Sequence, residues 1–320
     1  MSKQHDPTLA LRVAILAGGN SAEAQVSRNS AAQIEQALVD SGHKTQVIEL
    51  NDQCVQALLT MQPDVVFPAL HGPPGEDGTV QGMLEILRLP YVGSDVRGSA
   101  LAMDKAIAKS VFFRQGLPVS EDYTVRPGDD LSAAAKAIQA QLGDRVALKP
   151  LNQGSAIGVQ LLPNGGDIAA ALQESIEYGS CLVEPYIEGR EMTVGVLQLQ
   201  DERLVHPVIE IHTPVGAWYD YEHRYTAGQS EHVLPASISE DLGHRLQAIA
   251  ASAHQALGLR DLSRADFIVT REDEISLLEV NALPGMTPVS LYPEGAAAIG
   301  YPFKRLVHTL VAQAFQRGLL

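Results

Sequence analysis

An alternation of strand-like and helix-like segments near the N-terminus restricts this chain to few folds. Residues 12–17 (RVAILA), 45–50 and 65–70 are predicted to be strands, with helices over residues 27–41 and 54–61 between them. A β-α-β-α-β order requires a parallel sheet with right-handed crossovers. Ligands bind such sheets beyond the carboxyl ends of the strands. The loops GGNSAE, after the first strand, and HGPPGEDG, after the third, therefore mark a predicted binding edge.

Composition limits the class of protein and the class of partner. The chain has 320 residues, enough for two or three domains, and 45% of them are apolar. A net charge of −15 argues against nucleic acid as a partner. No stretch reaches the length of a membrane span. Cys54 and Cys181 lie far apart without metal-ligand spacing. We therefore expect a cytoplasmic protein with reduced cysteines. The polar residues 1–10 lack a signal peptide's apolar segment and are predicted to be a short disordered tail.

The first predicted binding loop does not carry a dinucleotide-binding sequence. GGNSAE departs from G-x-G-x-x-G, so a nicotinamide oxidoreductase is a distant alternative. Glu23 follows this loop at the start of a helix. It either stabilises the helix dipole or holds a substrate ammonium group. His71 ends the third strand before a Gly/Pro loop, where a structural role competes with a functional one.

The middle of the chain carries candidate phosphate-binding groups. Residues 145–162 are predicted to be strand, glycine-containing loop and strand, with Lys149 at the end of the first strand. Gly154 to Gly158 lie in a loop whose backbone N–H groups either close over phosphates or form a plain hairpin. No Walker A sequence is present. Lys105 lies in a helix predicted over residues 100–115 and, taken alone, is most simply a solvated lysine.

Two further segments complete the predicted site. Glu184 and Glu191 flank a bend between two strands within residues 181–197. Residues 211–235 contain WYDYEHRY and little hydrophobic periodicity. Because aromatic residues argue against disorder, we expect this segment to be a lid. Helices are predicted over residues 241–257 and from about 303 to 316.

Strands predicted at residues 263–270 and 274–281 would pair as a hairpin. Side chains two residues apart share a face of a strand. The hairpin would therefore bring Arg264 and Asp266 to the same spot as Glu279 and Asn281. Carboxylate and amide oxygens suit Mg²⁺ bridged to phosphates, and an arginine suits a phosphoryl group that gains charge.

With these motifs in order, the chain resembles the D-alanine–D-alanine ligase family of the ATP-grasp superfamily. The resemblance runs from Arg12 to the last helix and rests on these segments: GGNSAEAQVSRNS, ALHGPPGEDGTVQGMLE, SALAMDK, LKPLNQGSAIG, WYDYEHRY, RADF and LEVNALPGMT. It implies an N-terminal Rossmann-like parallel α/β domain followed by a two-domain ATP-grasp fold. The implied limits are residues 1–93 for the substrate domain, 94–187 for the central domain and 188–320 for the C-terminal domain.

The resemblance also implies an activity. One D-alanine is phosphorylated by ATP at its carboxylate, and the amine of a second D-alanine attacks that acyl phosphate, for peptidoglycan precursor synthesis. The implied cofactors are ATP as substrate and two Mg²⁺, with Mn²⁺ as a substitute. A homodimer is the implied assembly.

The roles that the resemblance implies fall into four groups. The residues that would bind ATP are Lys105, Lys149, Ser155, Glu184, Ile187 (through its backbone), Glu191 and Arg224. The residues that would bind metal are Asp266, Glu279 and Asn281. The residues that would bind the amino acids are Glu23, His71, Ser290 and Leu291. The residues with implied catalytic roles are Glu23, Ser155 and Tyr225 as a hydrogen-bonded triad, and Arg264 with the Gly285 N–H at the acyl centre.

Several positions depart from the family pattern. Arg224 stands where the family usually has lysine, Pro185 replaces a lysine and Ala156 replaces a serine. Pro288 and Val289 precede Ser290 near the pocket for the second substrate. These departures leave two alternatives: a ligase that joins D-alanine to another acceptor such as D-serine, or an inactive nucleotide-binding relative. Tyr225 favours an amine acceptor, because the relatives that use D-lactate carry a different lid.

Overall fold

A computed structural model describes residues 10–318, except residues 201, 215, 227, 288 and 289. Residues 1–9 of the predicted tail and the Pro288-Val289 pair lie outside the described residues. Within the described part of the chain, no helix is long and apolar enough to cross a membrane.

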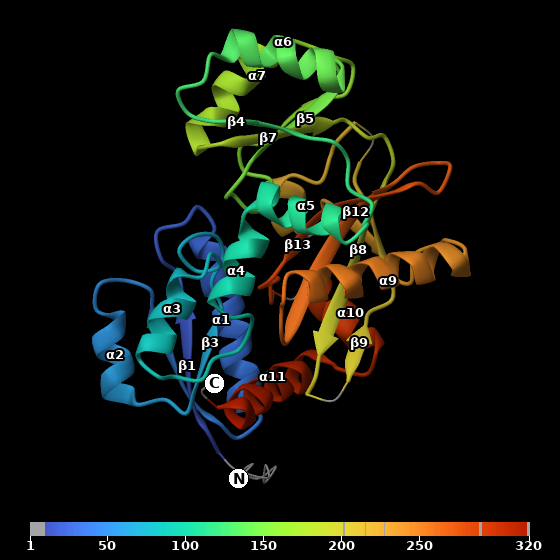
Figure 1. The fold of residues 1–320 in the computed structure, drawn as a ribbon. Coiled ribbons are helices and arrows are strands. Elements are labelled where there is room, and N and C mark those ends of the chain that lie inside the picture. The colour runs from blue at the N-terminus through green and yellow to red at the C-terminus, as the bar shows by residue number, and fades with distance from the viewer. Residues whose placement is uncertain (1–9, 201, 215, 227, 288–289, 319–320) are drawn as a thin grey trace.

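The N-terminal sheet has the parallel topology that the sequence predicts. Its strands are β1 (Arg12–Ala17), β2 (Lys44–Glu49) and β3 (Val65–Pro68), in the order β2-β1-β3. The helices α1 (Ala24–Val39), α2 (Cys54–Met61) and α3 (Thr79–Ile86) surround it (Figure 1). The helix α1 begins three residues before its predicted start, so Glu23 occupies its N-cap position.

An antiparallel four-stranded sheet forms the upper part of the molecule in Figure 1. Its strand order is β4 (Tyr123–Val125), β7 (Cys181–Pro185), β5 (Val146–Pro150) and β6 (Gln160–Leu162). The helices α6 (Leu131–Leu142) and α7 (Ile168–Ser175) cover one face, and a short 3₁₀ turn follows α7. The two strands predicted within residues 145–162 are present as β5 and β6, and they are antiparallel neighbours.

A larger antiparallel sheet joins the other two parts. Its order is β11 (Glu231–Val233), β10 (Ile209–His212), β8 (Arg190–Gln198), β12 (Leu262–Val269) and β13 (Ile275–Asn281), and β9 (Arg203–Val205) pairs with β8. The helices α9 (Glu240–Ala256), α10 (Leu291–Ala298) and α11 (Phe303–Arg317) pack around it. The predicted hairpin is confirmed, with Arg264 opposite Asn281 and Asp266 opposite Glu279.

Two predictions about local structure need correction. The helix predicted over residues 100–115 is two helices, α4 (Val96–Met103) and α5 (Lys105–Arg114). Asp104 separates them in an extended conformation, and its carboxylate accepts a hydrogen bond from the Ile107 N–H. This N-cap starts a new helix at Lys105. The lid segment is not a continuous loop, because it contains α8 (Tyr221–Tyr225) and β11.

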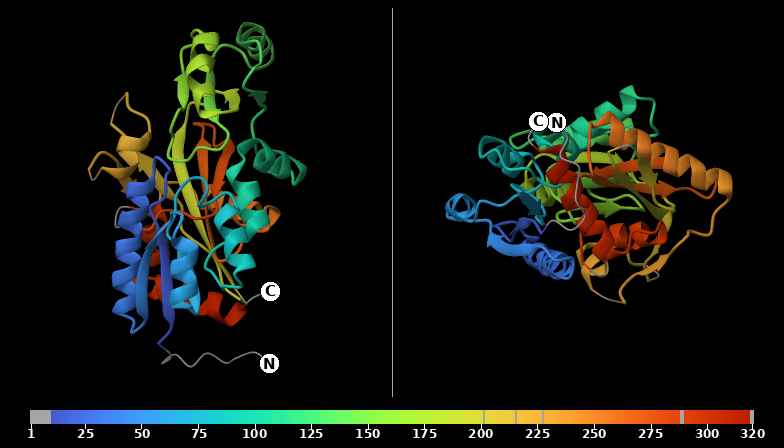
Figure 2. Two further views of the ribbon diagram at one scale, coloured as in Figure 1. Left: turned by 90° about the vertical axis from the view of Figure 1, so that its left-hand side faces the viewer. Right: turned by 90° about the horizontal axis from the view of Figure 1, so that it is seen from below.

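Packing ties the two ends of the chain together. The C-terminal helix α11 lies beside α1, and both contribute to the core that also holds β1 and β3 (Figure 2). Asp261, which is fully buried, accepts hydrogen bonds from the Gly93 N–H, Gln313 and Arg317. The helices α4 and α5 pack against the larger sheet, whereas the four-stranded sheet has a core of its own. The domain limits given above remain a proposal.

Candidate active site

Two adjoining pockets lie where the three sheets meet. The first lies between the four-stranded sheet and the larger sheet, and the second faces the N-terminal sheet. They share Gly154, Tyr219 and Arg224 in their walls. Every residue given a site role from the sequence lines one of the two pockets except Asp266. The structure therefore brings together residues that are spread from position 23 to position 291.

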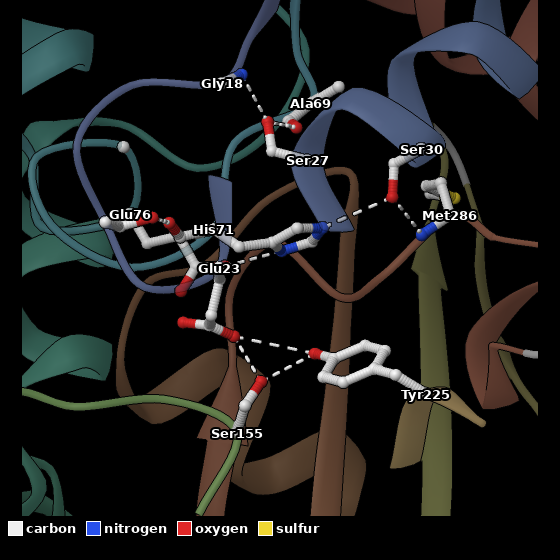
Figure 3. Close-up of polar contacts among 12 residues, drawn as sticks. Gly18, Glu23, Ser27, Ser30, Ala69, His71, Glu76, Ser155, Tyr225 and Met286 are labelled. Atoms are coloured by element: carbon white, nitrogen blue, oxygen red, sulfur yellow. Dashed lines mark hydrogen bonds and ion pairs between the residues drawn. The ribbon is translucent and has the colours of Figure 1, made fainter. Parts of the chain in front are cut away.

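A hydrogen-bonded triad closes the second pocket (Figure 3). The Ser155 hydroxyl donates to Glu23 Oε1 and lies 2.6 Å from the Tyr225 hydroxyl. Tyr225 OH is also 3.5 Å from Glu23 Oε1. Burial raises the pKa of the Tyr225 phenol, and the negative charge of Glu23 raises it further. Tyr225 therefore keeps its proton and donates to Ser155 Oγ, so it is a donor rather than a base in this arrangement.

The backbone around Ser155 explains how its hydroxyl reaches Glu23. Ser155 and Ala156 have φ values of 49° and 60°, in the left-handed region that residues with a Cβ seldom occupy. Gly154 comes so close to Glu23 that an added Cβ would lie 2.8 Å from Oε2. A larger residue there would displace the Glu23 carboxylate from its contact with Ser155. The loop between β5 and β6 is thus held against the N-terminal domain by contacts of its own residues.

His71 joins a network that crosses from the N-terminal domain to the loop after β13 (Figure 3). Its Nδ1 lies 3.4 Å from Glu76 Oε1, and its Nε2 lies 3.3 Å from Ser30 Oγ. An ionised carboxylate only accepts, so Nδ1 carries the proton and Nε2 accepts from the Ser30 hydroxyl. The Met286 N–H donates to the same Ser30 oxygen at 3.4 Å. Ser30 therefore connects His71 to the segment beside Gly285.

Arg264 and Asp266 form a buried bidentate pair on β12. Arg264 Nε and Nη2 donate to Asp266 at 2.8 and 2.7 Å, and the Thr193 hydroxyl donates to Asp266 Oδ1 at 2.6 Å. Burial opposes ionisation of Asp266, but the Arg264 charge outweighs it and lowers the pKa of the carboxyl. The pair leaves the guanidinium edge of Arg264 in the wall of the second pocket.

Three lysines and a buried glutamate line or support the first pocket. Lys105 Nζ donates to the Gln153 carbonyl at 2.6 Å and lies 3.5 Å from Glu279 Oε2. Lys149 Nζ donates to Glu184 Oε2 at 2.6 Å, and Lys109 Nζ donates to the other oxygen of Glu184. Burial opposes ionisation of Glu184, but the two ammonium groups lower its pKa to about 2. Lys105 and Lys149 therefore place two ammonium groups in the wall of the first pocket.

The other side of the first pocket comes from the lid and the bend. Ile187 and Glu191 lie in its wall with Trp218 and Tyr219. Arg224 stacks over the Tyr219 ring at 4.5 Å and donates through Nε to the Tyr219 carbonyl at 3.0 Å. The aromatic residues of the predicted lid thus lie in the pocket wall beside the Arg224 cation, and aromatic surface next to a cation suits a nucleotide.

The turn after β13 shapes the far wall of the second pocket. Ser290 Oγ accepts from the Thr287 N–H at 3.0 Å and lies 2.8 Å from the Thr287 hydroxyl. An added Cβ at Gly285 would come within 2.9 Å of Ser290 Oγ, so glycine lets the backbone pass close to this hydroxyl. Ser290 and Leu291 both line the pocket.

Four supporting residues were not predicted from the sequence: Ser30, Glu76, Lys109 and Thr193. Ser30, Lys109 and Thr193 each contact a predicted residue from a distant part of the chain, whereas Glu76 lies five positions after His71. The one available sequence signal is spacing. Lys109 follows Lys105 by four residues, which places both on one face of a helix.

Comparison with known proteins identifies the family. Residues 111–312 match the family model described as D-ala D-ala ligase C-terminus, and residues 50–94 match D-ala D-ala ligase N-terminus. The chain is 44% identical over 314 residues to the D-alanine--D-alanine ligase of Granulibacter bethesdensis, covering 96% of this chain and 99% of that one. It is 41% identical over 308 residues to that of Desulforudis audaxviator, covering 96% and 99%.

The fold agrees with the sequence comparison. The crystal structure of D-alanine--D-alanine ligase from Bacillus anthracis complexed with ATP superposes with a TM-score of 0.82 at 26% identity, covering 95% of this chain and 97% of that one. The predicted α/β architecture with an ATP-grasp fold is confirmed by such matches. Full-length identity and both family models agree, and the chain therefore belongs to the D-alanine–D-alanine ligase family.

Proposed function

We propose that this protein is an ATP-dependent ligase that joins two D-alanines through a D-alanyl phosphate, supplying a peptidoglycan precursor. The observation that carries the proposal is the pair of adjoining pockets. One carries the cations of Lys105, Lys149 and Arg224 beside aromatic side chains, as a nucleotide requires. The other combines a carboxylate at Glu23 with a buried arginine at Arg264, as an amino acid and an acyl phosphate require. The names of the full-length relatives agree with this activity.

We assign the first pocket to ATP. Lys105 and Lys149 would hold the phosphates, and the loop at Ser155 would close over them through backbone N–H groups. Glu184, Glu191 and the backbone at Ile187 would hold the adenosine. Arg224, which lines both pockets, would face the phosphate being transferred. The relative from Bacillus anthracis was solved with ATP, which supports this assignment.

We assign the second pocket to the two amino acids. Glu23 would hold the ammonium of the first D-alanine, with His71 near its carboxylate. Ser290 and Leu291 would contact the second D-alanine. The Arg264 guanidinium and the Gly285 N–H would stabilise negative charge at the acyl centre, which is the largest contribution in many acyl-transfer enzymes.

The residues of the hairpin fit divalent cations. Asp266 and Glu279 face each other across β12 and β13, and Asn281 follows on the same face. Two carboxylates and a carboxamide are hard oxygen donors suited to Mg²⁺ or Mn²⁺. Among the described residues, no group of three or more His, Cys, Asp or Glu forms a complete metal site. Two cations bound here would therefore take phosphate oxygens and water as further ligands. When bound, they would neutralise charge on the transferring phosphoryl group.

The triad gives the lid a function in this chemistry. An acyl phosphate hydrolyses when water reaches it, so the site must be closed while the intermediate exists. Contacts among Glu23, Ser155 and Tyr225 join the N-terminal domain, the glycine loop and the lid in one place. A homodimer and a cytoplasmic location, which the family resemblance implies, are part of the same proposal.

We expect Tyr225→Phe to raise the fraction of ATP that is hydrolysed without dipeptide formation. Removing the hydroxyl loosens the lid by one hydrogen bond, worth about 0.5–1.5 kcal/mol, so turnover should fall by less than about tenfold. ADP release and dipeptide formation measured on the same sample give the ratio. Tyr221→Phe is a matched control on the same helix. An unchanged ratio with Tyr225→Phe would show that the triad does not exclude water.

The proposed activity is tested by ADP release with Mg²⁺ and ATP. D-Alanine should stimulate release strongly, and L-alanine should leave it at the level seen without an amino acid. Equal release with and without D-alanine would instead indicate a nucleotide-binding protein that has lost the ligase reaction.

A further inference from the structure

Lys109 is a buried cation that the assignments above leave without a role. It lies on α5, one helical turn after Lys105, and only 4% of it is exposed. Its ammonium group donates to Glu184 Oε1, to the Ser120 hydroxyl at 3.1 Å and to the Glu121 carbonyl at 3.3 Å. It also lies 3.6 Å from Asp122. A lysine buried so completely requires paired partners, and here the main partner is Glu184.

Lys109 reaches the first pocket through Glu184 and Ser120, and does not line it. The pocket is lined by Glu184, Ser120 and Lys149, but not by Lys109. Glu184 is itself only 3% exposed, and Ser120 donates to the same Oε1 at 2.9 Å. Lys149 holds the other oxygen. Lys109 thus holds one carboxylate oxygen from behind, whereas Ser120 and Lys149 contact the carboxylate from the pocket side.

We propose that Lys109 is a positioning residue for the nucleotide base, which orients Glu184 so that its carboxylate selects a purine carrying an exocyclic amine. A carboxylate offers about four lone-pair sites, and Lys109, Ser120 and Lys149 occupy three of them. The remaining site accepts an N–H. The amine of adenine supplies that donor, whereas the carbonyl oxygen of guanine at the same position would face a negative charge. This inference rests on the assignment of the first pocket to ATP.

The negative charge of Glu184 makes its carboxylate a hydrogen-bond acceptor only. A neutral Glu184 would carry a proton on one oxygen and could act as a donor to guanine. The two lysines prevent this, because they keep the pKa of Glu184 at about 2 although burial opposes ionisation. Without Lys109, only Lys149 remains to offset burial. The pKa of Glu184 would then rise, and its carboxylate would be free to rotate.

The test replaces Lys109 with methionine, which keeps the length of the side chain and removes the charge. We expect KM for ATP to rise about tenfold, by analogy with the loss of one charge-assisted hydrogen bond. We expect kcat and the KM for D-alanine to stay within about twofold, because Lys109 does not line the second pocket, which is assigned to the amino acids. The preference for ATP over GTP in kcat/KM should fall. Lys136→Met, at an exposed position on α6, is the matched control and should change none of these values.

A pH profile of the KM for ATP distinguishes a positioning role of Lys109 from a role in the stability of the fold alone. In the wild-type protein Glu184 is ionised throughout pH 5 to 8, so its titration should not change the KM for ATP in this range. In Lys109→Met, KM for ATP should increase as the pH falls from 8 to 5, because protonation removes the acceptor. Ser120→Ala, which removes one anchor and no charge, should reduce ATP selectivity without this pH dependence. It also serves if Lys109→Met fails to fold.

Equilibrium binding of ATP, measured by calorimetry without D-alanine, keeps this inference separate from the ligase proposal. Weaker ATP binding and unchanged GTP binding by Lys109→Met support it, whether or not the wild-type protein forms a dipeptide. Unchanged selectivity, or equal losses for ATP and GTP with a flat pH profile, would show that Lys109 only stabilises the fold.

Discussion

Arg264→Ala is expected to lower turnover by about 10²–10³, by analogy with the loss of one oxyanion-stabilising donor. The guanidinium is buried, with 8% of the residue exposed, and its direction is fixed by two bonds to Asp266. In the proposed reaction its charge would therefore face the acyl centre without reorganisation. Steady-state turnover at saturating ATP and D-alanine measures the effect. Arg264→Lys should recover little, because an ammonium cannot reproduce the bidentate fork.

A matched control is available on the neighbouring strand β8. Arg190 makes the same kind of bidentate pair with Glu210, at 2.6 Å for both bonds, and lines neither pocket. Arg190→Ala leaves the buried Glu210 without its guanidinium partner, but it should retain turnover within about twofold because Arg190 lines neither pocket. If Arg264→Ala kept near-wild-type turnover, or if both variants lost activity equally, the role of Arg264 at the acyl centre would be wrong.

Asp261→Ala is expected to cause the largest loss of stability, about 3–5 kcal/mol, because it leaves the charge of Arg317 without its partner. Asp261 is fully buried and accepts from Arg317 Nη1 at 2.6 Å and from the Gly93 N–H at 2.7 Å. These bonds tie α11 and the end of the N-terminal domain to β12. With roughly 2–4 °C for each kcal/mol, thermal unfolding should begin about 10 °C lower.

The exposed pair of Arg28 and Glu49 provides the comparison for Asp261. Its side chains are 45% and 40% exposed, so Glu49→Ala should lower the melting temperature far less than Asp261→Ala does, although it also removes the acceptor of the Gly19 N–H. Thermal melts of both variants, followed by circular dichroism, test the difference. A melt of Asp261→Ala that matches the Glu49→Ala melt would show that the two ends of the chain are held by apolar packing alone.

Periodicity predicted the parts of the fold that depend on local sequence. The helix α2 was predicted at its observed limits, and the hairpin of β12 and β13 places Asp266 opposite Glu279 as expected. The break at Asp104 was missed because the apolar pattern continues across it, and only the cap in the folded chain shows where a second helix starts. Short elements such as β4 and β9 were missed because three residues carry too little pattern.

The limits of prediction in the site are also physical. Residues that face a ligand lie in loops and strand ends with recognisable motifs, as Arg264 and Ser155 do. Residues that support them from behind are fixed by tertiary contact. Ser30 reaches Met286, 256 positions later, and Lys109 reaches Glu184, 75 positions later. No local pattern encodes such pairs, so the positioning groups become visible only in the folded chain.

The most direct test of the ligase assignment is the mass of the product formed from ATP, Mg²⁺ and amino acids. With D-alanine alone, we expect the D-alanine dipeptide and one ADP for each dipeptide. With D-alanine and D-serine in equal amounts, we expect the same dipeptide as the main product. A mixed dipeptide as the main product, with no product from D-alanine alone, would contradict the assignment and show that the second pocket binds a different acceptor.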